Sequence, residues 1–379
     1  MSLLDLLKQK KYCTTWASSQ YLTETFNMSE VPLSNNSLRQ VIHASIGGSV
    51  IKIKLSNRCG DQPLQIREVH IAYSKEQGSG AIIPETDKVV TFKGKKEIII
   101  PEGKEAYSDD ITFEIEPMCE LAVTIFFGNV PMKVTGHPGS RTNFYIEKGN
   151  ALKEETFTHR KKAAHWYVLA AVEVLTENNK KAIVCFGDSI TDGRGSTDDK
   201  QNRWTDIFLT RLYENKRTAG FAVINQGIGG TCVQGCGQER YDRDVLSLPG
   251  AKAVIVLYGI NDIMYLNSDS DTIISIYKDL IAKAHKKGLK IFGGTLLPFG
   301  DNCEWNEKRE EVRLAVNKWI LENAGSPKGF DAAIDFAQAM KAGNEEKLRE
   351  SNENDGLHPT VKGYEDMANA IPLSLFEEL

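Results

Sequence analysis

Two patterns of hydrophobic and polar positions divide the chain. Between about residues 49 and 145, short runs alternate apolar and polar side chains and are separated by Gly, Pro, Asn and Asp. Such alternation predicts strands with one covered face, as at residues 50–55, 68–73 and 111–115. The spacing of the turns is typical of a sandwich or jelly roll. We therefore expect an all-β sandwich domain, jelly-roll-like, over residues 1–176.

The second half alternates longer apolar runs with amphipathic stretches. The runs predict strands at residues 182–186, 221–225, 253–258, 289–297 and 330–336. Between them, apolar residues recur at helical spacing, namely Ile273, Tyr277, Leu280, Ile281 and Ala284, and then Val312, Ala315, Val316, Trp319 and Ile320. Near-continuous apolar strands separated by helices predict a parallel sheet that is covered on both faces. We expect an α/β domain over residues 177–379.

Composition and charge exclude several classes of protein. The chain has 379 residues, 41% hydrophobic and 26% charged, as in soluble globular proteins. Its 46 basic and 51 acidic residues give a net charge of −5, which favours neither a nucleic-acid nor a membrane partner. The longest apolar stretches, at 163–175 and 253–258, are shorter than the roughly 20 residues that cross a bilayer. The sequence is compatible with a homo-oligomer.

The cysteines and the start of the chain indicate a cytoplasmic location. Seven cysteines are odd in number and scattered, which favours reduced thiols over a disulfide framework. Residues 1–8 place acidic and basic residues in the wrong order for a secretory signal, although a leader removed earlier would leave no trace. Cys232 and Cys236 have no partners at zinc spacing, so we expect no metal site.

A serine follows the first predicted strand of the α/β half. Residues 186–191 read Phe-Gly-Asp-Ser-Ile-Thr, at the carboxyl end of that strand, where ligands bind in parallel sheets. Gly187 permits a tight turn that presents Ser189 as a nucleophile, and the alternative is an ordinary polar turn. Phosphate-loop, zinc-helix and GxSxG motifs are missing, and the string Gly-Ile-Gly-Gly at 227–230 is weak evidence for a nucleotide cofactor.

Among the seven histidines, His358 has the context of a catalytic base. It lies in a loop before a final helix, three residues after Asp355. At this spacing, one tight turn allows the Asp355 carboxylate to accept the Nδ1 proton, which leaves Nε2 free to face a serine. The alternative is a capped turn, with Asp355 bonded to backbone amides and His358 in water.

Acyl transfer also needs donors for an oxyanion, and two further strand ends offer them. The glycine-rich turn at 225–230 can point a backbone N–H into a site, and Asn261, in Gly-Ile-Asn-Asp at 259–262, offers a side-chain amide. Each segment alone is equally explained as a turn or a cap. Their placement after three successive strands, ahead of the Asp-x-x-His segment, favours a shared site.

These four segments resemble the four blocks of the SGNH, or GDSL, hydrolase superfamily, in order from residue 187 to residue 358. The resemblance implies Ser189 as nucleophile, the backbone N–H groups of Ser189 and Gly230 and the amide of Asn261 as oxyanion donors, and His358 with Asp355 as base and orienter. It also implies a flavodoxin-like three-layer fold for this half and no metal or organic cofactor.

Further segments look like the bacterial xylan-esterase-like branch of the superfamily, at residues 37–41, 44–48, 190–196, 202–204 and 240–246. Members of that branch resemble carbohydrate acetylesterases with an N-terminal β-sandwich. The resemblance implies a serine esterase that removes acetyl groups from sugars such as acetylated xylo-oligosaccharides. We interpret the charges of Arg240, Asp242, Arg243 and Asp244 as an ion-pair and capping cluster.

Several alternatives stay open. Asp188, Trp204 and Trp305 are candidate substrate contacts, although core packing explains either tryptophan equally well. The ester could instead be a lysophospholipid or a thioester. In another class, the chain could be a non-catalytic carbohydrate-binding protein. Asp192 could rival Asp355 as orienter of the base, but we expect it to cap the following helix.

Overall fold

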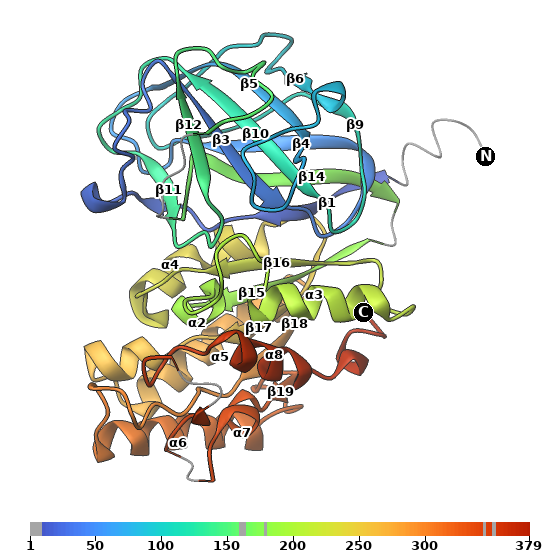
Figure 1. Cartoon of the computed structure of the whole chain (residues 1–379). Coiled ribbons are helices and arrows are strands. Elements are labelled where there is room, and N and C mark those ends of the chain that lie inside the picture. Colours follow the sequence, from blue (N-terminus) through green and yellow to red (C-terminus); the bar gives the residue numbers. More distant parts are fainter. Residues whose placement is uncertain (1–9, 159–163, 178–179, 344–345, 351–353) are drawn as a thin grey trace, which may run out of the picture. The chain divides into compact units, whose positions relative to one another are not determined.

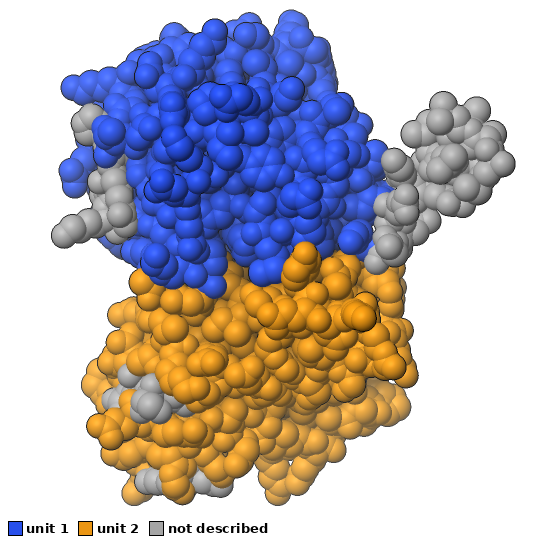
Figure 2. Space-filling view, turned by 45° about the vertical axis from the view of Figure 1, so that its right-hand side comes forward, with its two compact units in different colours: residues 1–180, 198–201 blue, residues 181–197, 202–379 orange. Residues whose placement is uncertain are grey.

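The computed structural model describes residues 10–158, 164–177, 180–343, 346–350 and 354–379. The chain divides into two compact units, residues 1–180 with 198–201 and residues 181–197 with 202–379 (Figure 2). The sequence-based division lies between residues 176 and 177, and the compact units divide between 180 and 181, with the short segment 198–201 grouped with the first unit.

The first unit is built from antiparallel sheets (Figure 1). One sheet has the order β1 (Lys10–Ala17), β14 (Leu169–Glu177), β4 (Gly48–Ser56), β8 (Glu105–Tyr107), with β9 (Ile111–Ile115) also on β4. A second has the order β12 (Phe144–Lys148), β3 (Asn36–His43), β10 (Glu120–Phe127), β5 (Leu64–Tyr73), β6 (Lys88–Val90), with β7 (Ile98–Ile100) also on β5. A small third sheet contains β13 (His165–Tyr167), β11 (Thr135–Pro138) and β2 (Tyr21–Leu22).

The alternating pattern of the sequence is realised in these strands. In β9, Ile111, Phe113 and Ile115 are buried, and the two residues between them are exposed. This is the pattern of an antiparallel strand with one face on a core. The predicted strands at 50–55, 68–73 and 111–115 lie within β4, β5 and β9, so the prediction of an N-terminal β-sandwich is confirmed.

The second unit, in its described residues, contains a five-stranded parallel sheet. Its order is β16 (Phe221–Gly227), β15 (Lys181–Gly187), β17 (Ala251–Leu257), β18 (Lys290–Gly294), β19 (Ala332–Ile334). The first strand along the chain therefore lies between the second and the third, which is the flavodoxin-like order. Nearly every residue of β15 is buried, as expected for a strand covered on both faces.

Helices cover both faces of this sheet (Figure 1). They are α2 (Ser189–Asp192), α3 (Trp204–Glu214), α4 (Gln238–Tyr241), α5 (Ser270–Lys286), α6 (Glu307–Glu322), α7 (Phe336–Met340) and α8 (Val361–Asn369). Helix α3 packs on α8 and β16, whereas α5 packs on α6 and β18. Across the sheet, the step from β15 to β16 runs in one direction and the steps from β17 to β18 and β19 run in the other. Because connections between parallel strands are right-handed, α3 and α5 lie on opposite faces of the sheet. The three-layer prediction is confirmed.

The buried face of α6 differs from the one that the sequence predicts. Val316 and Ile320 are buried as expected, but Ala315 is exposed and the polar Arg313 and Asn317 are buried instead. The Arg313 guanidinium pairs with a carboxylate one turn back and donates to the Leu296 carbonyl at 3.0 Å. Asn317 bonds both the N–H and the C=O of Leu296, at 2.7 and 2.8 Å. Because these polar groups are satisfied, the helix can bury them.

No helix in the described residues has both the length and the apolar character needed to span a membrane. All seven cysteines lie in the described part of the chain, and none forms a disulfide bond.

Candidate active site

Ser189 lies where the chain turns from β15 into α2. Gly187, the last residue of β15, must be a glycine because a Cβ there would lie 2.3 Å from the Leu257 carbonyl oxygen on β17. Asp188 is the N-cap of α2, and its carboxylate accepts a hydrogen bond from the Ile190 N–H at 3.0 Å. This tight turn leaves Ser189 with 5% of its surface exposed, at the first residue of a helix and at the carboxyl edge of the sheet.

The imidazole of His358 connects this serine to a carboxylate. Its Nε2 atom lies 2.7 Å from the Oγ atom of Ser189. Its Nδ1 atom lies 2.8 Å from Oδ2 and 3.0 Å from Oδ1 of Asp355. A proton on Nδ1, donated to the carboxylate, leaves Nε2 as an acceptor for the serine proton. The structure thus brings the three predicted residues into one chain of hydrogen bonds, that of a Ser-His-Asp triad.

A tight turn before α8 holds the acid and the base together. Oδ1 of Asp355 also accepts the backbone N–H groups of His358, at 2.8 Å, and Leu357, at 3.2 Å. Gly356 has φ +75, and a Cβ there would lie 2.5 Å from the carbonyl carbon of Asp301, so the turn needs glycine. Asp355 therefore both caps the turn and orients the ring, the two roles that the sequence presents as alternatives.

The same contacts determine the charge of Asp355. Partial burial acts to raise the pKa of this carboxyl group, but hydrogen bonds from the backbone and ring of His358 lower the pKa below its usual value. The carboxylate is consequently ionised at neutral pH. Its negative charge favours a protonated imidazole, which forms whenever His358 takes a proton from Ser189.

The glycine-rich turn after β16 runs beside the serine. Its Ile228 N–H donates to the Gly187 carbonyl at 3.1 Å, which joins this turn to the end of β15. A Cβ on Gly229 would lie 3.7 Å from the Cβ of Ser189. Gly230 has φ +74, and no described atom lies within 4 Å of its Cβ position, so the space beside it is open. The backbone of this turn is therefore available to a group bound at Ser189.

Asn261 is held against the same turn. It is buried just after β17, and its Nδ2 atom donates to the carbonyl of Thr231, the residue after Gly230, at 2.8 Å. An amide nitrogen carries two hydrogens, so one remains for an oxyanion. Segments after three adjacent strands, β16, β15 and β17, thus carry Gly230, Ser189 and Asn261.

Asp262 holds the segment that follows the glycine-rich turn. The sequence alone does not reveal this role. The buried carboxylate of Asp262 accepts the N–H groups of Val233, at 2.9 Å, and Gln234, at 2.8 Å, which follow the glycine-rich turn. Burial raises the pKa of Asp262. Its position next to Asn261 was the available signal, because Asn-Asp pairs often bond nearby backbone groups.

An exposed aromatic side chain, also not singled out by the sequence, follows Asn261. Tyr265 lies in a π-helical turn, Asp262–Leu266, and is 57% exposed. Burial of the phenol, and then the charges of Glu304, Cys303 and Asp355, raise its pKa, whereas the charge of Arg194 lowers it. The carboxylate of Asp355 is thus one of several charges that act on the phenol of Tyr265.

The three predicted substrate contacts have different surroundings in the structure. Trp204 is 0% exposed and packs against Phe336 with ring centroids 5.5 Å apart, so it belongs to the core and offers no surface to a sugar. Asp188 is buried as the cap of α2, and burial raises its pKa to about 7. Trp305 is half-buried, in a turn whose Asn302 side chain donates to the Asp355 carbonyl at 3.2 Å. Only Trp305 stays a candidate contact.

The prediction that Asp192 caps the following helix is wrong. Arg203 is the N-cap of α3, and its backbone and guanidinium bond the Asp206 carboxylate at 3.0 and 2.7 Å. Asp192 instead ends α2 as a buried residue, because α2 stops after one turn and the loop to α3 is long.

Across the described ranges, no three or more His, Cys, Asp or Glu side chains are placed so that they could hold a metal ion.

Comparisons with known proteins found a family model that matches most of the second unit. Residues 185–365, which include every residue of the triad and the predicted oxyanion donors, match the model of the GDSL-like lipase/acylhydrolase family. The search of curated proteins found no match.

Several solved structures are also similar to part of this chain. A GDSL-like lipase from Bacteroides thetaiotaomicron is 22% identical with a TM-score of 0.42, over 52% of this chain and 89% of that one. A member of the lipolytic protein G-D-S-L family from Veillonella parvula is 23% identical with a TM-score of 0.42, over 52% of this chain and 100% of that one. An acetyl xylan esterase, AlAXEase, is 23% identical with a TM-score of 0.40, over 50% of this chain and 96% of that one.

Proposed function

We propose that the chain, whose residues 185–365 match the model of the GDSL-like lipase/acylhydrolase family, is a serine esterase that removes acetyl groups from O-acetylated sugars. The observation that carries the proposal is the hydrogen-bonded series from Ser189 Oγ through the His358 ring to Asp355, with distances of 2.7 and 2.8 Å. Serine is a weak nucleophile unless a base takes its proton, and this series supplies the base.

In the acylation step, Nε2 of His358 takes the proton of Ser189 while Oγ attacks the ester carbonyl carbon. The carbonyl electrons move to its oxygen, and the resulting oxyanion is bound by the N–H groups of Ser189 and Gly230 and the amide of Asn261. Asp355 stabilises the imidazolium. The imidazolium then protonates the leaving sugar oxygen as the ester bond breaks, which leaves free sugar hydroxyl and acetyl-serine.

In the deacylation step, His358 takes a proton from a water molecule, and the water oxygen attacks the acetyl-serine carbonyl. The same three donors bind the second oxyanion. When this intermediate collapses, the imidazolium returns its proton to Ser189 Oγ and acetate leaves. The donors act twice in each turnover, so their placement influences both halves of the reaction.

An acetylated sugar as substrate is supported by aromatic side chains near the triad. Tyr265 exposes its ring four residues after Asn261, and the turn of Trp305 is tied to the Asp355 loop through Asn302. Aromatic rings bind the apolar faces of sugars while their polar edges bond to hydroxyl groups. The sequence segments that resemble xylan-esterase-like proteins point the same way. We propose small-molecule or oligosaccharide esters as substrates.

The test is a comparison of acetate release from acetylated xylo-oligosaccharides by the wild type and by Ser189→Ala. We expect release by the wild type alone. A series of 4-nitrophenyl esters then examines the acyl chain. A maximum at acetate supports the proposal, whereas a maximum at octanoate or longer contradicts it and favours a lysophospholipase- or thioesterase-type activity.

Covalent labelling separates an esterase from a carbohydrate-binding protein without catalysis. A phosphonate ester reacts with a serine only when a base activates it. We expect one label on the wild type, on Ser189, and none on Ser189→Ala. An unlabelled wild type that still binds xylo-oligosaccharides would replace the esterase with a binding function.

A further inference from the structure

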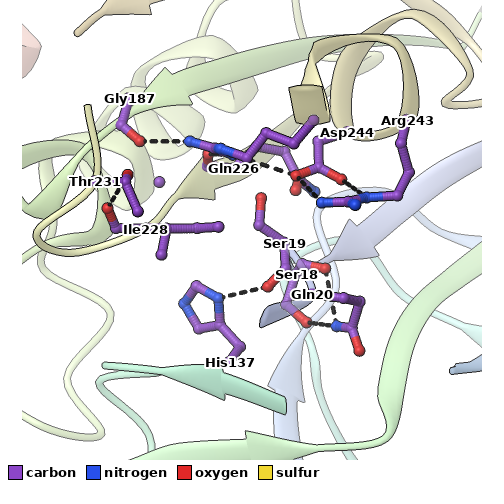
Figure 3. A network of polar contacts seen from close by, with 12 residues as sticks. Ser18, Ser19, Gln20, His137, Gly187, Gln226, Ile228, Thr231, Arg243 and Asp244 are labelled. Atoms are coloured by element: carbon purple, nitrogen blue, oxygen red, sulfur yellow. Dashed lines mark hydrogen bonds and ion pairs between the residues drawn. The ribbon is translucent and has the colours of Figure 1, made fainter. Parts of the chain in front are cut away.

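Arg240 lies buried at the ends of two strands that carry the predicted site. It belongs to α4 and is 2% exposed. Its Nη2 atom donates to the carbonyl of Gly187, the last residue of β15, at 2.8 Å, and its Nη1 atom donates to the carbonyl of Gln226 on β16 at 2.7 Å. Figure 3 shows Gly187 and Gln226 in this polar network. One side chain thus joins the strand before Ser189 to the strand before the glycine-rich turn.

The guanidinium also touches the third strand end of the site. Its carbon lies 4.2 Å from the ring centroid of Phe186, on β15, and 5.3 Å from that of Tyr258, which directly follows β17. Buried cation–π contacts of this kind are stabilising and restrict both partners. Arg240 therefore contacts the carboxyl ends of β15, β16 and β17, the three strands followed by Ser189, Gly230 and Asn261.

Hydrogen bonds continue from Arg240 toward the side-chain donor. The hydroxyl of Tyr258, whose ring contacts Arg240, lies 2.6 Å from Oγ1 of Thr231. The carbonyl of Thr231 accepts the Nδ2 hydrogen of Asn261 at 2.8 Å. Three contacts, through Tyr258 and Thr231, therefore connect the Arg240 guanidinium to the side-chain amide of Asn261.

The charge of Arg240 is balanced within the same unit. Oδ2 of Asp244, one turn further along the chain, accepts from Arg240 at 3.2 Å, and Arg243 bonds the same carboxylate at 2.5 and 3.0 Å. Figure 3 shows Arg243 and Asp244 side by side. Because the charge is paired, the guanidinium can remain ionised and hold two carbonyls in a buried position.

We propose that Arg240 is a positioning residue for the oxyanion hole. An oxyanion hole works only when its donors are fixed in advance, within a few tenths of an ångström, because rearrangement during the reaction adds to the barrier. Arg240 sets the spacing between the turn of Ser189 and the turn of Gly230, and through Tyr258 it sets the orientation of Asn261. This inference rests on the proposed esterase function and goes beyond the ion-pair role that the sequence suggests for Arg240.

The experiment compares Arg240→Lys and Arg240→Gln with the wild type, with Arg243→Gln as matched control. Arg243 binds the same Asp244 carboxylate, so its replacement removes a similar charge pair. Active sites are titrated with a phosphonate ester, so that kcat refers only to molecules with a competent Ser189. The second readout is the inhibition constant of methylboronic acid, which forms a tetrahedral, negatively charged adduct with the serine and occupies the oxyanion hole.

We expect Arg240→Gln to lower kcat for 4-nitrophenyl acetate by about 10- to 100-fold. This is less than the largest effect of removing an oxyanion donor, which is about 1000-fold. The inhibition constant of methylboronic acid should rise by a similar factor. The KM should stay close to that of the wild type, and Arg240→Lys should recover part of both losses. The control Arg243→Gln should behave like the wild type.

Two outcomes overturn the inference. In one, both Arg240 variants keep the wild-type kcat per titrated site and the wild-type affinity for the boronate. Only the fraction of titratable sites or the melting temperature then falls, and this result would show that Arg240 has a purely structural role. In the other, Arg243→Gln loses as much kcat as Arg240→Gln. The wild type is assayed before any Arg240 variant is made. If it neither hydrolyses an ester nor reacts with the phosphonate, the proposed function itself is contradicted.

Discussion

The Nε2 atom of His358 lies 2.7 Å from the Oγ atom of Ser189, although the two residues are 169 positions apart in the chain. The sheet order explains how they meet, because β15 lies inside the sheet and the chain returns to its carboxyl edge in the loop before α8. Ser189 is fixed by a helix cap and His358 by the turn of Asp355. Both partners are therefore held before substrate arrives.

Replacement of His358 by Ala removes the base. We expect kcat for 4-nitrophenyl acetate to fall by about 10⁴-fold or more, because the nitrogen that accepts the Ser189 proton is lost. Labelling by a phosphonate ester should slow in parallel. The control is His285→Ala, since His285 lies at the surface end of α5 and bonds Asp331 at 3.0 Å. Wild-type kcat in His358→Ala would exclude this histidine from the mechanism.

Replacement of Asp355 by Asn tests which acid orients the base. We expect kcat to fall by about 10³- to 10⁴-fold, because an amide does not hold His358 in the required tautomer. Asp192→Asn, which changes the rival acid, should cost much less activity. Because the pKa of Asp355 is lowered, loss of activity in mild acid should not come from protonation of this carboxylate. A larger loss in Asp192→Asn than in Asp355→Asn would reverse the assignment.

Replacement of Asn261 by Ala removes one oxyanion donor. We expect kcat to fall by about 100-fold or more, with little change in KM, because the oxyanion exists only in the transition state and the intermediates. Active-site titration with a phosphonate ester shows whether the remaining molecules are folded around Ser189. Normal turnover in Asn261→Ala would remove this amide from the mechanism.

Much of this site was predictable because its residues follow strand ends. In a parallel sheet, apolar runs mark the strands and their carboxyl ends share one edge, so Ser189, Gly230 and Asn261 are expected there together. Asp355 and His358 were predictable as a pair because they lie three positions apart in one turn. Local spacing of this kind depends on backbone geometry alone, which the sequence encodes directly.

The sequence predicted less well which polar side chains are buried. Arg240 lies in a run of charges that indicates an ion-pair and capping cluster, and Arg313 lies beside the apparent apolar stripe of α6, yet both are buried. Their partners are main-chain carbonyls of distant strands and loops, at Gly187 and Leu296. Such partners have no side-chain signature, so periodicity cannot reveal them. The reverse holds for Trp204, whose aromatic ring suits both a sugar platform and a core.

Replacement of Trp204 tests its assignment to the core. We expect Trp204→Ala to lower the free energy of unfolding by about 3 to 5 kcal/mol, as for other buried aromatic side chains. Urea unfolding followed by loss of esterase activity reports on the second unit, which contains Trp204. Trp204→Phe should keep the KM for acetylated xylo-oligosaccharides. A raised KM in Trp204→Phe with unchanged stability would indicate a substrate contact instead.

Asp188 should make stability depend on pH. Burial, assisted by the charge of Asp262 and opposed by the Ile190 N–H and the charge of Arg240, raises the pKa of Asp188 from 3.8 to about 7. The folded protein therefore binds the proton more tightly than the unfolded chain does. The resulting stabilisation is complete below about pH 4 and disappears as the pH rises through about 7.

Asp188→Asn removes this titration while keeping a side chain that can cap α2. We expect the unfolding free energy of the variant, measured in urea and compared with that of the wild type, to rise by at most about 4 kcal/mol between pH 4 and pH 8. Groups that titrate equally in both proteins cancel in this difference. Asp331→Asn is a control that should show little change between pH 4 and pH 8, because the pKa of Asp331 is lowered and its titration lies below about pH 4. A difference between Asp188→Asn and the wild type that stays constant with pH would mean that Asp188 is ionised throughout, with the cap and Arg240 outweighing its burial.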